Sequence, residues 1–305
     1  MTTQIHINQR TLAATVTCSG IGVHSGKQVN LKIRPAPINH GIKFLRVDLP
    51  GTPCVTAHFN RVVDTSLATV IGEEGCIIST IEHLMATFSG LSIDNAIVEV
   101  DSYELPIMDG SAGPFTRLIK SVGVVEQDRP RFFFVVKKAI ELNENGKSVC
   151  VYPASNIKIT YTIEYKNQLI NTQTASFLID ENIFEHEIAD ARTFGFTHEV
   201  EYMQKFGLAK GASLDNAIGI ENDEVKNPGG LRYDNEFVRH KILDCIGDFS
   251  LLGMPMLGHI VLKKSGHEFN HAFLEKFFAE KESWDTMSLS NPIPDQRVHT
   301  RKVAV

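Results

Sequence analysis

The stretch EQDRPRFFFVVKKAIEL, residues 126–142, divides the chain into two runs of secondary structure that resemble each other. Its first six residues are mostly charged and include Pro130, which disfavours helix and central strand, whereas residues 132–142 are rich in the Phe, Val and Ile that favour strands. We therefore predict an N-terminal domain over residues 1–127 and a C-terminal domain over residues 128–305.

Both predicted domains have strand-like segments first and helices after them. The first has strand patterns at 12–18, 29–34, 42–47 and 95–100 and helical patterns at 79–90 and from 114 onward. The second has four strand-like runs between 132 and 177, a loop at 192–196, a strand at 260–263, and helices at 181–191, 199–206, 235–252 and 269–284. Strands followed by helices, twice over, indicate an α+β fold of two sandwiches rather than a doubly wound sheet. Neither GxGxxG nor a P-loop pattern occurs, so a nucleotide-cofactor fold has no support.

The composition is that of an ordinary globular protein. Of 305 residues, 43% are hydrophobic and 22% are charged, and 30 basic against 36 acidic side chains give a net charge of −6. These values exclude disordered, collagen-like and disulfide-scaffold classes. The negative net charge argues against general nucleic-acid binding, because such binding depends on a basic surface.

The arrangement of the cysteines and the length of the apolar runs predict the cellular compartment. The five cysteines are scattered without a CxxC pair, which indicates reduced thiols in a cytoplasmic protein. The N-terminal MTTQIHINQR has no apolar signal region, and no apolar run approaches the roughly 18 residues of a membrane span. We therefore expect a soluble protein whose contact with membranes, if any, is peripheral.

The predicted helix at 235–252 carries three ionisable residues on one side. At 100° per residue, His240, Asp244 and Asp248 lie opposite an apolar face made by Val238, Ile242, Cys245 and Phe249. The simpler interpretation is a solvated face with a helix-stabilising His–Asp pair. However, Phe237 and Leu251 share the polar side, so water is not obviously its only neighbour.

A glycine on the same side points to a close neighbour. Gly247 costs about 1 kcal/mol of helix propensity relative to alanine, which suggests that another group approaches the backbone there. His240 and Asp244 are one turn apart and can bind one metal ion. With His83 they would form a two-His, one-carboxylate set with an open position, which is typical of catalytic rather than structural zinc.

The segment STIEHL at 79–84 allows two interpretations. Glu82 can form a capping box with Ser79 at the start of the helix. Alternatively His83 binds a metal while Glu82 acts as general base, an arrangement of neighbouring Glu and His that HExxH zinc proteases use. His267, in the turn SGH, is either a surface histidine or a cation aimed at an oxyanion and kept charged by Asp248.

Several long blocks in order make the chain resemble a known family. They are GVHSGK (22–27), RPAP (34–37), STIEHLMA (79–86), IDNAIVEV (93–100), LPIMDGSAGPF (105–115), ARTFGF (191–196), LRYDNEFVRHKILDCIGD (231–248) and KSGH (264–267). Together they resemble the UDP-3-O-acyl-N-acetylglucosamine deacetylases, the zinc enzymes of the committed step of lipid A synthesis. The resemblance implies two α+β sandwiches packed face to face, each with a small insert, and an active site between them.

The resemblance also implies roles for individual residues. His83, His240 and Asp244 would ligate zinc, and Glu82 would deprotonate the zinc-bound water that attacks the acetamide carbonyl. Protonated His267, paired with Asp248, would stabilise the oxyanion. The remaining positions would contact the oxyanion or the substrate: Thr193 (oxyanion), Phe194 (site wall), Lys241 and Lys264 (diphosphate), Tyr165 (uracil), and Val200, Ala212 and Ser213 (fatty acyl passage).

Alternatives remain open from the sequence. A His₂Asp set also suits iron(II), so Fe²⁺ is an alternative to Zn²⁺. The HxxxD spacing is compatible with a metal phosphohydrolase of a nucleotide sugar, and a non-catalytic nucleotide-sugar binding protein could use a structural metal. We expect a monomer that binds an acylated UDP-sugar, and no fused domain, because little chain follows Trp284.

Overall fold

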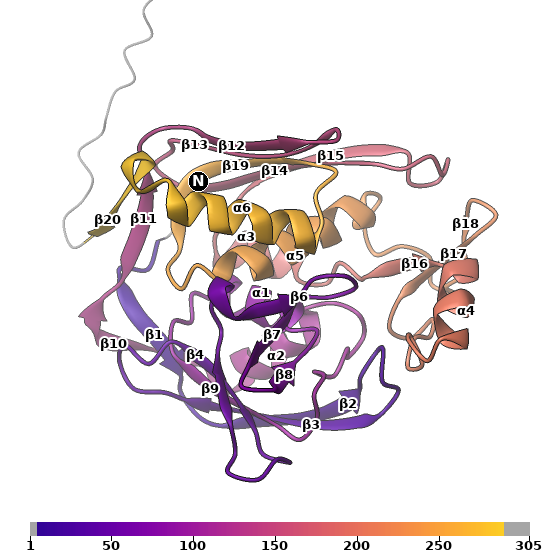
Figure 1. The fold of residues 1–305 in the computed structure, drawn as a ribbon, viewed down its shortest axis with the longest axis horizontal. Helices are drawn as coiled ribbons and strands as arrows, with labels where there is room; N and C mark the ends of the chain where they lie inside the picture. Colours follow the sequence, from indigo (N-terminus) through magenta and orange to yellow (C-terminus); the bar gives the residue numbers. More distant parts are fainter. Residues whose placement is uncertain (1–4, 290–305) are drawn as a thin grey trace, which may run out of the picture.

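Two sheets enclose the principal helices of the molecule, as the computed structural model shows (Figure 1). The structure describes residues 5–289. In Figure 1 the main sheet of the N-terminal half lies at the bottom and the main sheet of the C-terminal half lies at the top, with helices of both halves between them. This arrangement confirms the α+β class predicted from the order of strand-like and helical segments.

The N-terminal half forms a five-stranded sheet in the order β2-β3-β9-β4-β5. Its strands are β2 (Val16–Ile21), β3 (Gln28–Pro35), β4 (Ile42–Arg46), β5 (Cys54–Thr56) and β9 (Ala96–Val100), and only β4 and β9 pair in parallel. The helices α1 (Glu82–Gly90) and α2 (Gly113–Val122) cover it, and a small sheet of β6 (Val62–Asp64), β7 (Val70–Glu73) and β8 (Cys76–Ile78) is inserted after β5.

The C-terminal half repeats this connectivity. Its central strand β19 (Met256–Lys263) pairs with β13 (Lys147–Tyr152) in antiparallel and with β14 (Ile157–Glu164) in parallel orientation. The other strands of the sheet are β11 (Phe132–Val136), β12 (Ile140–Glu144), β15 (Thr172–Leu178) and β20 (Trp284–Ser288). The helices are α5 (Glu236–Ser250) and α6 (His267–Ala279). The repeat therefore exists in the topology, although the sequence has no obvious fixed period.

The second insert follows β15. It begins with a short helical segment, α3 (Glu181–Ile183) and the π-turn 184–188, and continues with β16 (Phe194–Phe196), α4 (Thr197–Lys205), β17 (Ile218–Glu221) and β18 (Glu224–Val225). Each half thus has a three-stranded insert between its hairpin strands and its first long helix. In Figure 1 the part of this insert made by β16, α4, β17 and β18 lies to the right, whereas α3 lies between the two sheets.

Alternating burial explains why the sheets face inward. In β3, Val29, Leu31 and Ile33 are at most 1% exposed while the residues between them are exposed, so one face packs against the helices. In α5 the predicted apolar face is buried, as expected. The opposite face is buried as well, because α1 packs on it; His240, Asp244 and Asp248 are only 2–4% exposed. The solvated-face interpretation of this helix is therefore wrong.

Gly247 is the residue that lets α1 and α5 approach so closely. A Cβ added there would lie 2.1 Å from the carbonyl oxygen of Glu82, in the backbone of α1. The close neighbour predicted from this glycine is thus the helix that carries Glu82 and His83.

We expect Gly247→Ala to destabilise the protein despite the better helix propensity of alanine. Propensity would add about 1 kcal/mol of stability, but overpacking against a backbone group typically costs about 1–3 kcal/mol or more and would separate the two helices. Thermal or denaturant unfolding measures the difference. Gly229→Ala is the control, because an added Cβ meets nothing within 4 Å there; equal stability of both variants would contradict the assignment.

Several predicted boundaries differ from the structure for local reasons. The predicted strand at 12–18 is two strands, β1 (Asn8–Leu12) and β2, because the chain passes from one sheet to another between them. The helix expected from 79 begins at Glu82, since Thr80 has a left-handed φ of 60° that a helix cannot contain. The loop expected at 192–196 contains β16, which pairs with β17.

Other differences lie in the C-terminal half. Five strands rather than four occupy 132–178, and the region 181–191 is only partly helical. The last helix ends at Ala279 instead of reaching Trp284, which begins β20 and pairs with Val136.

The segment EQDRPR, where we predict the domain boundary, is part of a strand. It falls largely in β10 (Val124–Pro130), which pairs with β1. One core cluster contains residues of both halves, so the two layers pack on each other. None of the helices between residues 5 and 289 is both long and apolar enough to cross a lipid bilayer. The expectation that no fused domain follows concerns the chain end and lies outside the described residues.

Candidate metal centre and active site

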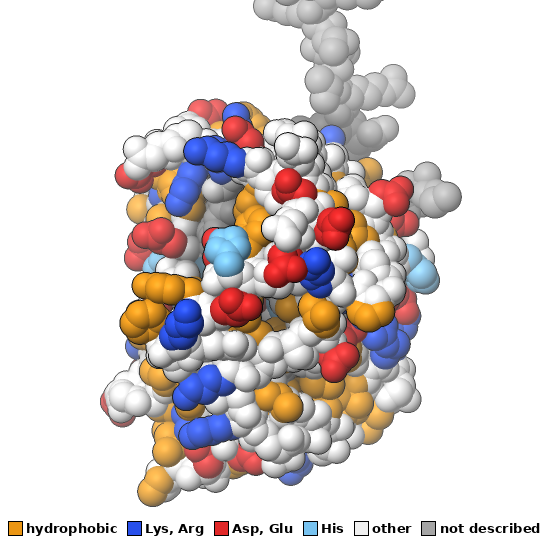
Figure 2. Space-filling view, turned by 90° about the vertical axis from the view of Figure 1, so that its right-hand side faces the viewer, with side chains coloured by type: hydrophobic (Ala, Val, Ile, Leu, Met, Phe, Trp, Pro, Cys, Tyr) orange, Lys and Arg blue, Asp and Glu red, His pale blue; other side chains and the backbone are white. Residues whose placement is uncertain are grey.

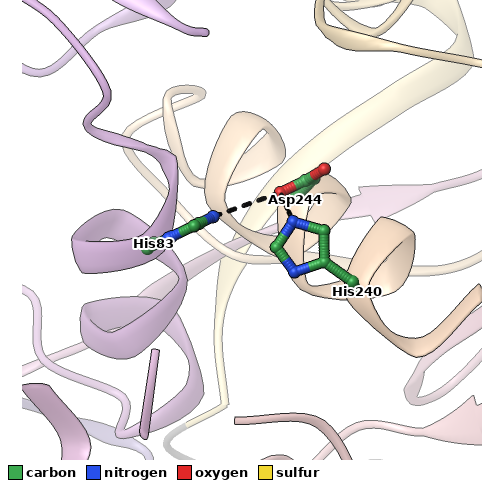
Figure 3. A group of neighbouring side chains, drawn as sticks. All are labelled: His83, His240 and Asp244. Carbon is green, nitrogen blue, oxygen red and sulfur yellow. Dashed lines mark ion pairs between the residues drawn. The ribbon is translucent and has the colours of Figure 1, made fainter. Parts of the chain in front are cut away.

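Three predicted metal ligands converge where α1 and α5 pack together (Figure 3). His83 projects from the first turn of α1, and His240 and Asp244 project from one side of α5. One ligand atom from each lies within 4.8 Å of the other two. The Oδ1 atom of Asp244 is 3.3 Å from His240 Nε2 and 3.7 Å from His83 Nε2. Ligands about 2.1 Å from one tetrahedral ion lie roughly 3.4 Å apart, so the spacing fits a single divalent cation.

The protonation states of the cluster also suit a cation. Burial lowers the pKa of His240 to about 4, so its imidazole is neutral near pH 7. Its Nδ1–H donates to the Ala191 carbonyl at 3.0 Å, which leaves the Nε2 lone pair free for a metal. Burial raises the pKa of Asp244, but His240 and Lys241 outweigh it and hold that pKa well below its usual value. The neutral imidazole of His240 and the carboxylate of Asp244 are thus available as ligands beside His83.

Glu82 lies beside this cluster and does not cap its helix. Ile81 is the N-cap of α1, and the backbone of Ser79 is bonded to Tyr103 and Leu105 instead, so the capping-box interpretation is wrong. Glu82 is 4% exposed, and its carboxylate accepts a hydrogen bond from the Thr69 backbone N–H at 3.1 Å. Burial raises its pKa above the usual value, which is the direction that a general base for a neutral reaction needs.

His267 faces Glu82 from the start of α6 and is held by Asp248. Its Nδ1–H donates to Asp248 Oδ2 at 2.9 Å, and its Nε2 is 3.7 Å from Glu82 Oε1. Burial alone would lower the pKa of His267, but Asp248 and then Glu82 outweigh it and raise the pKa to about 10. The predicted pairing of His267 with Asp248 is therefore present in the structure, next to the carboxylate of Glu82.

Asp248 is fixed by two residues that the sequence analysis missed. Thr69 donates its hydroxyl hydrogen to Asp248 Oδ1 at 2.6 Å, and Asn270 donates from Nδ2 to Oδ2 at 2.8 Å. Thr69 thus contacts both Glu82, through its backbone, and Asp248, through its side chain. No spacing or motif pointed to either residue, because they meet Asp248 only through the packing of the first insert and α6.

A cavity of about 1280 Å³, counting its open mouth, surrounds these groups. It is lined by the three metal ligands, Glu82 and His267, and by Thr193, Phe194, Val200, Ala212 and Lys241 among the other predicted site residues. Ser213 lines a smaller apolar cavity that shares Val200 and Ala212 with the first. The face of the molecule formed by the second insert is hollowed, with apolar and charged side chains at the rim (Figure 2).

Lys241 is a predicted substrate contact that bonds directly to one of the metal ligands. Its Nζ donates to Asp244 Oδ2 at 2.8 Å and lies 5.8 Å from the centre of the Phe194 ring. Burial would lower the pKa of Lys241, but Asp244 outweighs it and raises the pKa, so the side chain is cationic.

Two predicted substrate contacts, Tyr165 and Lys264, line neither of these cavities. Tyr165 packs edge-on against Phe194 at 5.8 Å between ring centres, immediately behind the wall. Lys264 lies in the turn after β19, with its Nζ 3.6 Å from Glu164 Oε2. Conversely, Lys147 and His24 line the cavity and were not predicted as site residues. His24 lies in the block GVHSGK, which carried the resemblance, so the sequence contained a signal for it.

Comparison with known proteins agrees with the geometry. A family model described as UDP-3-O-acyl N-acetylglycosamine deacetylase (LpxC) matches residues 9–279. A protein of Syntrophus aciditrophicus (strain SB) is 44% identical over 283 residues, which cover 93% of this chain and 90% of the relative. One of Myxococcus xanthus (strain DK1622) is 45% identical over 278 residues, 91% of this chain and 88% of the relative. Both relatives are named UDP-3-O-acyl-N-acetylglucosamine deacetylase.

Proposed function

Because the chain belongs to the UDP-3-O-acyl-N-acetylglucosamine deacetylase family, it catalyses this deacetylation in lipid A biosynthesis, and we propose that zinc bound by His83, His240 and Asp244 serves the reaction. The observation that carries the proposal is the convergence of three buried ligand atoms beside a buried carboxylate and a cationic imidazole. Two imidazoles and one carboxylate form a catalytic zinc set, and iron(II) is the alternative ion.

A bound divalent cation supplies a Lewis acid that polarises the acetamide carbonyl and lowers the pKa of water. In the proposed mechanism Glu82 accepts the proton of the attacking water. His267 donates a hydrogen bond to the oxyanion that develops on the carbonyl and then a proton to the leaving amine at C2 of the sugar. The distance of 3.7 Å between Glu82 Oε1 and His267 Nε2 supports Glu82 as the base and His267 as the acid, because both must reach the same reacting group.

The remaining site residues would bind and orient the substrate. Thr193 would donate its hydroxyl hydrogen to the oxyanion, with Phe194 forming the wall behind it. The apolar cavity bordered by Val200, Ala212 and Ser213 would receive the fatty acyl chain. Lys241 and Lys264 would attract the diphosphate, and Tyr165 would stack on uracil. The cationic state of Lys241 supports its role, since phosphates bind strongly to charged donors.

A metal phosphohydrolase of a nucleotide sugar has less support. Such enzymes often use two metals and more carboxylates. Between residues 5 and 289, His83, His240 and Asp244 are the single group with metal-binding spacing, and only one of them is a carboxylate.

The proposed reaction is tested by product identity. Incubation with UDP-3-O-acyl-N-acetylglucosamine should release acetate and leave the diphosphate intact, and a chelator should stop acetate release until Zn²⁺ is restored. Reconstitution with Fe²⁺ in the absence of oxygen compares the two ions. Release of a phosphorylated sugar, or acetate release that survives complete metal removal, would contradict the proposal.

We also propose that the protein acts in the cytoplasm and that its two domains meet near residues 127 and 128. We further propose that the protein is a monomer. All predicted catalytic groups come from one copy of the chain, which supports a monomer. Light scattering after gel filtration tests this; a dimer at assay concentration would contradict it.

We expect a bell-shaped dependence of kcat/KM on pH. Activity should rise as pH passes through the raised pKa of Glu82, which must be ionised, and fall as pH passes through that of His267, which must stay protonated. Asp248→Asn removes the largest cause that raises the pKa of His267, so the alkaline limb should move to lower pH. Asp94→Asn, at a carboxylate paired with Arg131 away from the cavity, is the control. A flat profile between about pH 5 and 9 for Asp248→Asn would contradict the acid–base pair.

A further inference from the structure

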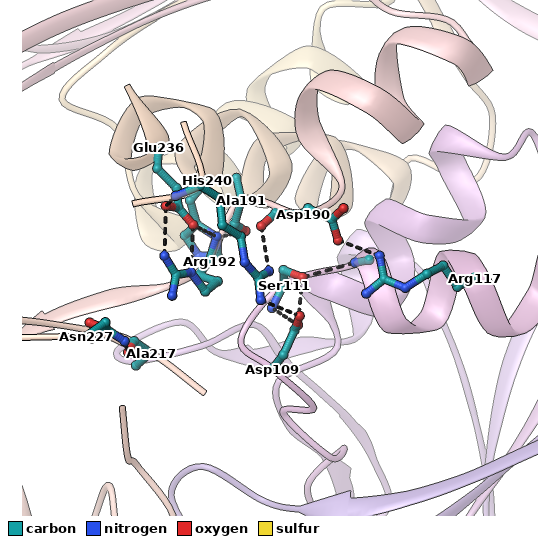
Figure 4. A network of polar contacts seen from close by, with 12 residues as sticks. Asp109, Ser111, Arg117, Asp190, Ala191, Arg192, Ala217, Asn227, Glu236 and His240 are labelled. Atoms are coloured by element: carbon teal, nitrogen blue, oxygen red, sulfur yellow. Dashed lines mark hydrogen bonds and ion pairs between the residues drawn. The ribbon is translucent and has the colours of Figure 1, made fainter. Parts of the chain in front are cut away.

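Glu236, the first residue of α5, is a carboxylate with no exposed surface and a complete set of hydrogen bonds (Figure 4). Its Oε1 accepts from Arg192 N at 3.0 Å and Arg192 Nε at 2.9 Å. Its Oε2 accepts from Arg192 Nη2 at 3.1 Å and Arg232 N at 2.6 Å. A carboxylate is almost never fully buried unless it is paired, and here every donor belongs to Arg192 or Arg232.

The residues on either side of Arg192 both reach the site. Ala191 uses its carbonyl to accept the Nδ1–H of His240 at 3.0 Å. Thr193 lines the cavity, and its backbone is fixed at both ends, since its N–H donates to Gly110 O and its carbonyl accepts from Ile218 N, each at 2.8 Å. The Arg192 backbone N–H, held by Glu236, therefore lies between the partner of a metal ligand and the predicted oxyanion donor.

Glu236 itself does not touch the cavity. Neither Glu236 nor Arg192 is among the residues that line it, and the Arg192 guanidinium also donates to Gly230 O at 2.7 Å, outside the cavity lining. His240 is one turn after Glu236 in α5, so the same helix carries the carboxylate that anchors residues 191–193 and the histidine that these residues orient.

We propose that Glu236 is a positioning residue: through Arg192 it fixes the Ala191 carbonyl against His240 and fixes Thr193 in the cavity wall. The inference rests on the proposed roles of His240 and Thr193. It assigns one buried carboxylate the task of setting the tautomer of a metal ligand and the place of an oxyanion donor. A merely structural Glu236 would instead support only the start of α5 and the stability of the fold.

The test is Glu236→Gln, which has the same shape but replaces one acceptor oxygen by an amide that faces N–H donors. We expect Zn²⁺ affinity, measured by competition with a chromophoric chelator, to fall about 10- to 100-fold, as for the loss of other partners of metal ligands. In the metal-free protein, nitrogen NMR should show His240 shifting from the Nδ1–H tautomer to a mixture. In the zinc-loaded protein kcat should fall more than KM changes.

Asp94→Asn is the matched control. Asp94 is another largely buried carboxylate, which accepts from Arg131 Nε at 2.7 Å and from Arg10 N at 3.0 Å, and it lies outside the cavity lining. Its loss should lower thermal stability as Glu236→Gln does, yet leave Zn²⁺ affinity, the His240 tautomer and kcat unchanged.

The inference is overturned if Glu236→Gln keeps the wild-type tautomer and affinity, or loses no more affinity than Asp94→Asn. If Glu236→Gln does not fold, the double variant Arg192→Gln and Glu236→Gln replaces it, because it leaves no unpaired buried charge. Its Zn²⁺ affinity and His240 tautomer are measured in the same way. If the proposed metal site itself is wrong, the wild-type protein would bind Zn²⁺ no better than His240→Ala does. In that case the comparison of His240 tautomers between the wild type and Glu236→Gln would still decide the role of Glu236.

Discussion

Replacement of His240 by alanine is expected to lower the rate of deacetylation about 1000-fold or more, because Lewis-acid stabilisation is worth several kcal/mol and each 1.36 kcal/mol is tenfold in rate. His240 is 2% exposed, its Nε2 points toward Asp244, and its Nδ1 is held by a backbone carbonyl, so alanine removes a ligand that is already oriented. Zinc content by atomic emission should fall together with activity.

Two controls distinguish loss of the metal from loss of the folded structure: chelation of the wild-type protein, and substitution of a second histidine. Chelated wild-type protein should reach a similarly low rate and recover with Zn²⁺, whereas His240→Ala should not recover at stoichiometric zinc. His271→Ala is the matched control, since this histidine also lies on a helix and bonds a backbone carbonyl, that of Phe59, but lies outside the cavity lining. A His240→Ala protein with full zinc content and full turnover would refute the assigned metal site.

Replacement of Glu82 by glutamine should lower kcat about 10²- to 10⁴-fold while zinc stays bound, the usual range for loss of a general base. Glutamine keeps the oxygen that accepts the Thr69 N–H but cannot take a proton from water. KM should change little, because the carboxylate acts mainly in the transition state. The measurements are kcat, KM and bound zinc on the same preparation.

Glu181→Gln is the control for this substitution. Glu181 pairs with Arg10 at 3.0 Å and lies outside the cavity lining, so its change should leave kcat unaltered. Glu82→Ala should resemble Glu82→Gln. Full turnover of either Glu82 variant with zinc bound would show that another group accepts the proton.

The helices and strands whose formation depends on residues close together in the sequence were predictable. The apolar periodicity of 235–252 indicates α5 and its core face, and Gly247 within it indicates that another group packs closely on this helix. Predictions failed where pairing partners lie far along the chain: residues 192–196 look like a loop because β16 is short and becomes a strand only by pairing with β17. The capping interpretation of Glu82 failed because its carboxylate bonds Thr69 rather than the start of its own helix.

The same holds for the active site: some of its features follow from residues close in sequence, and others from contacts between distant segments. The sequence by itself determined the residue types, the i, i+4 spacing of His240 and Asp244, and, through the family resemblance, the expectation that His83 joins them. Only the tertiary structure decided that the polar side of α5 is buried, that Thr69 and Asn270 hold Asp248, and that Glu236 holds Arg192 beside the carbonyl that His240 bonds. The physical reason is that periodicity and propensity act within a few residues, whereas burial and pKa shifts arise from segments that meet only when the sheets close over the helices.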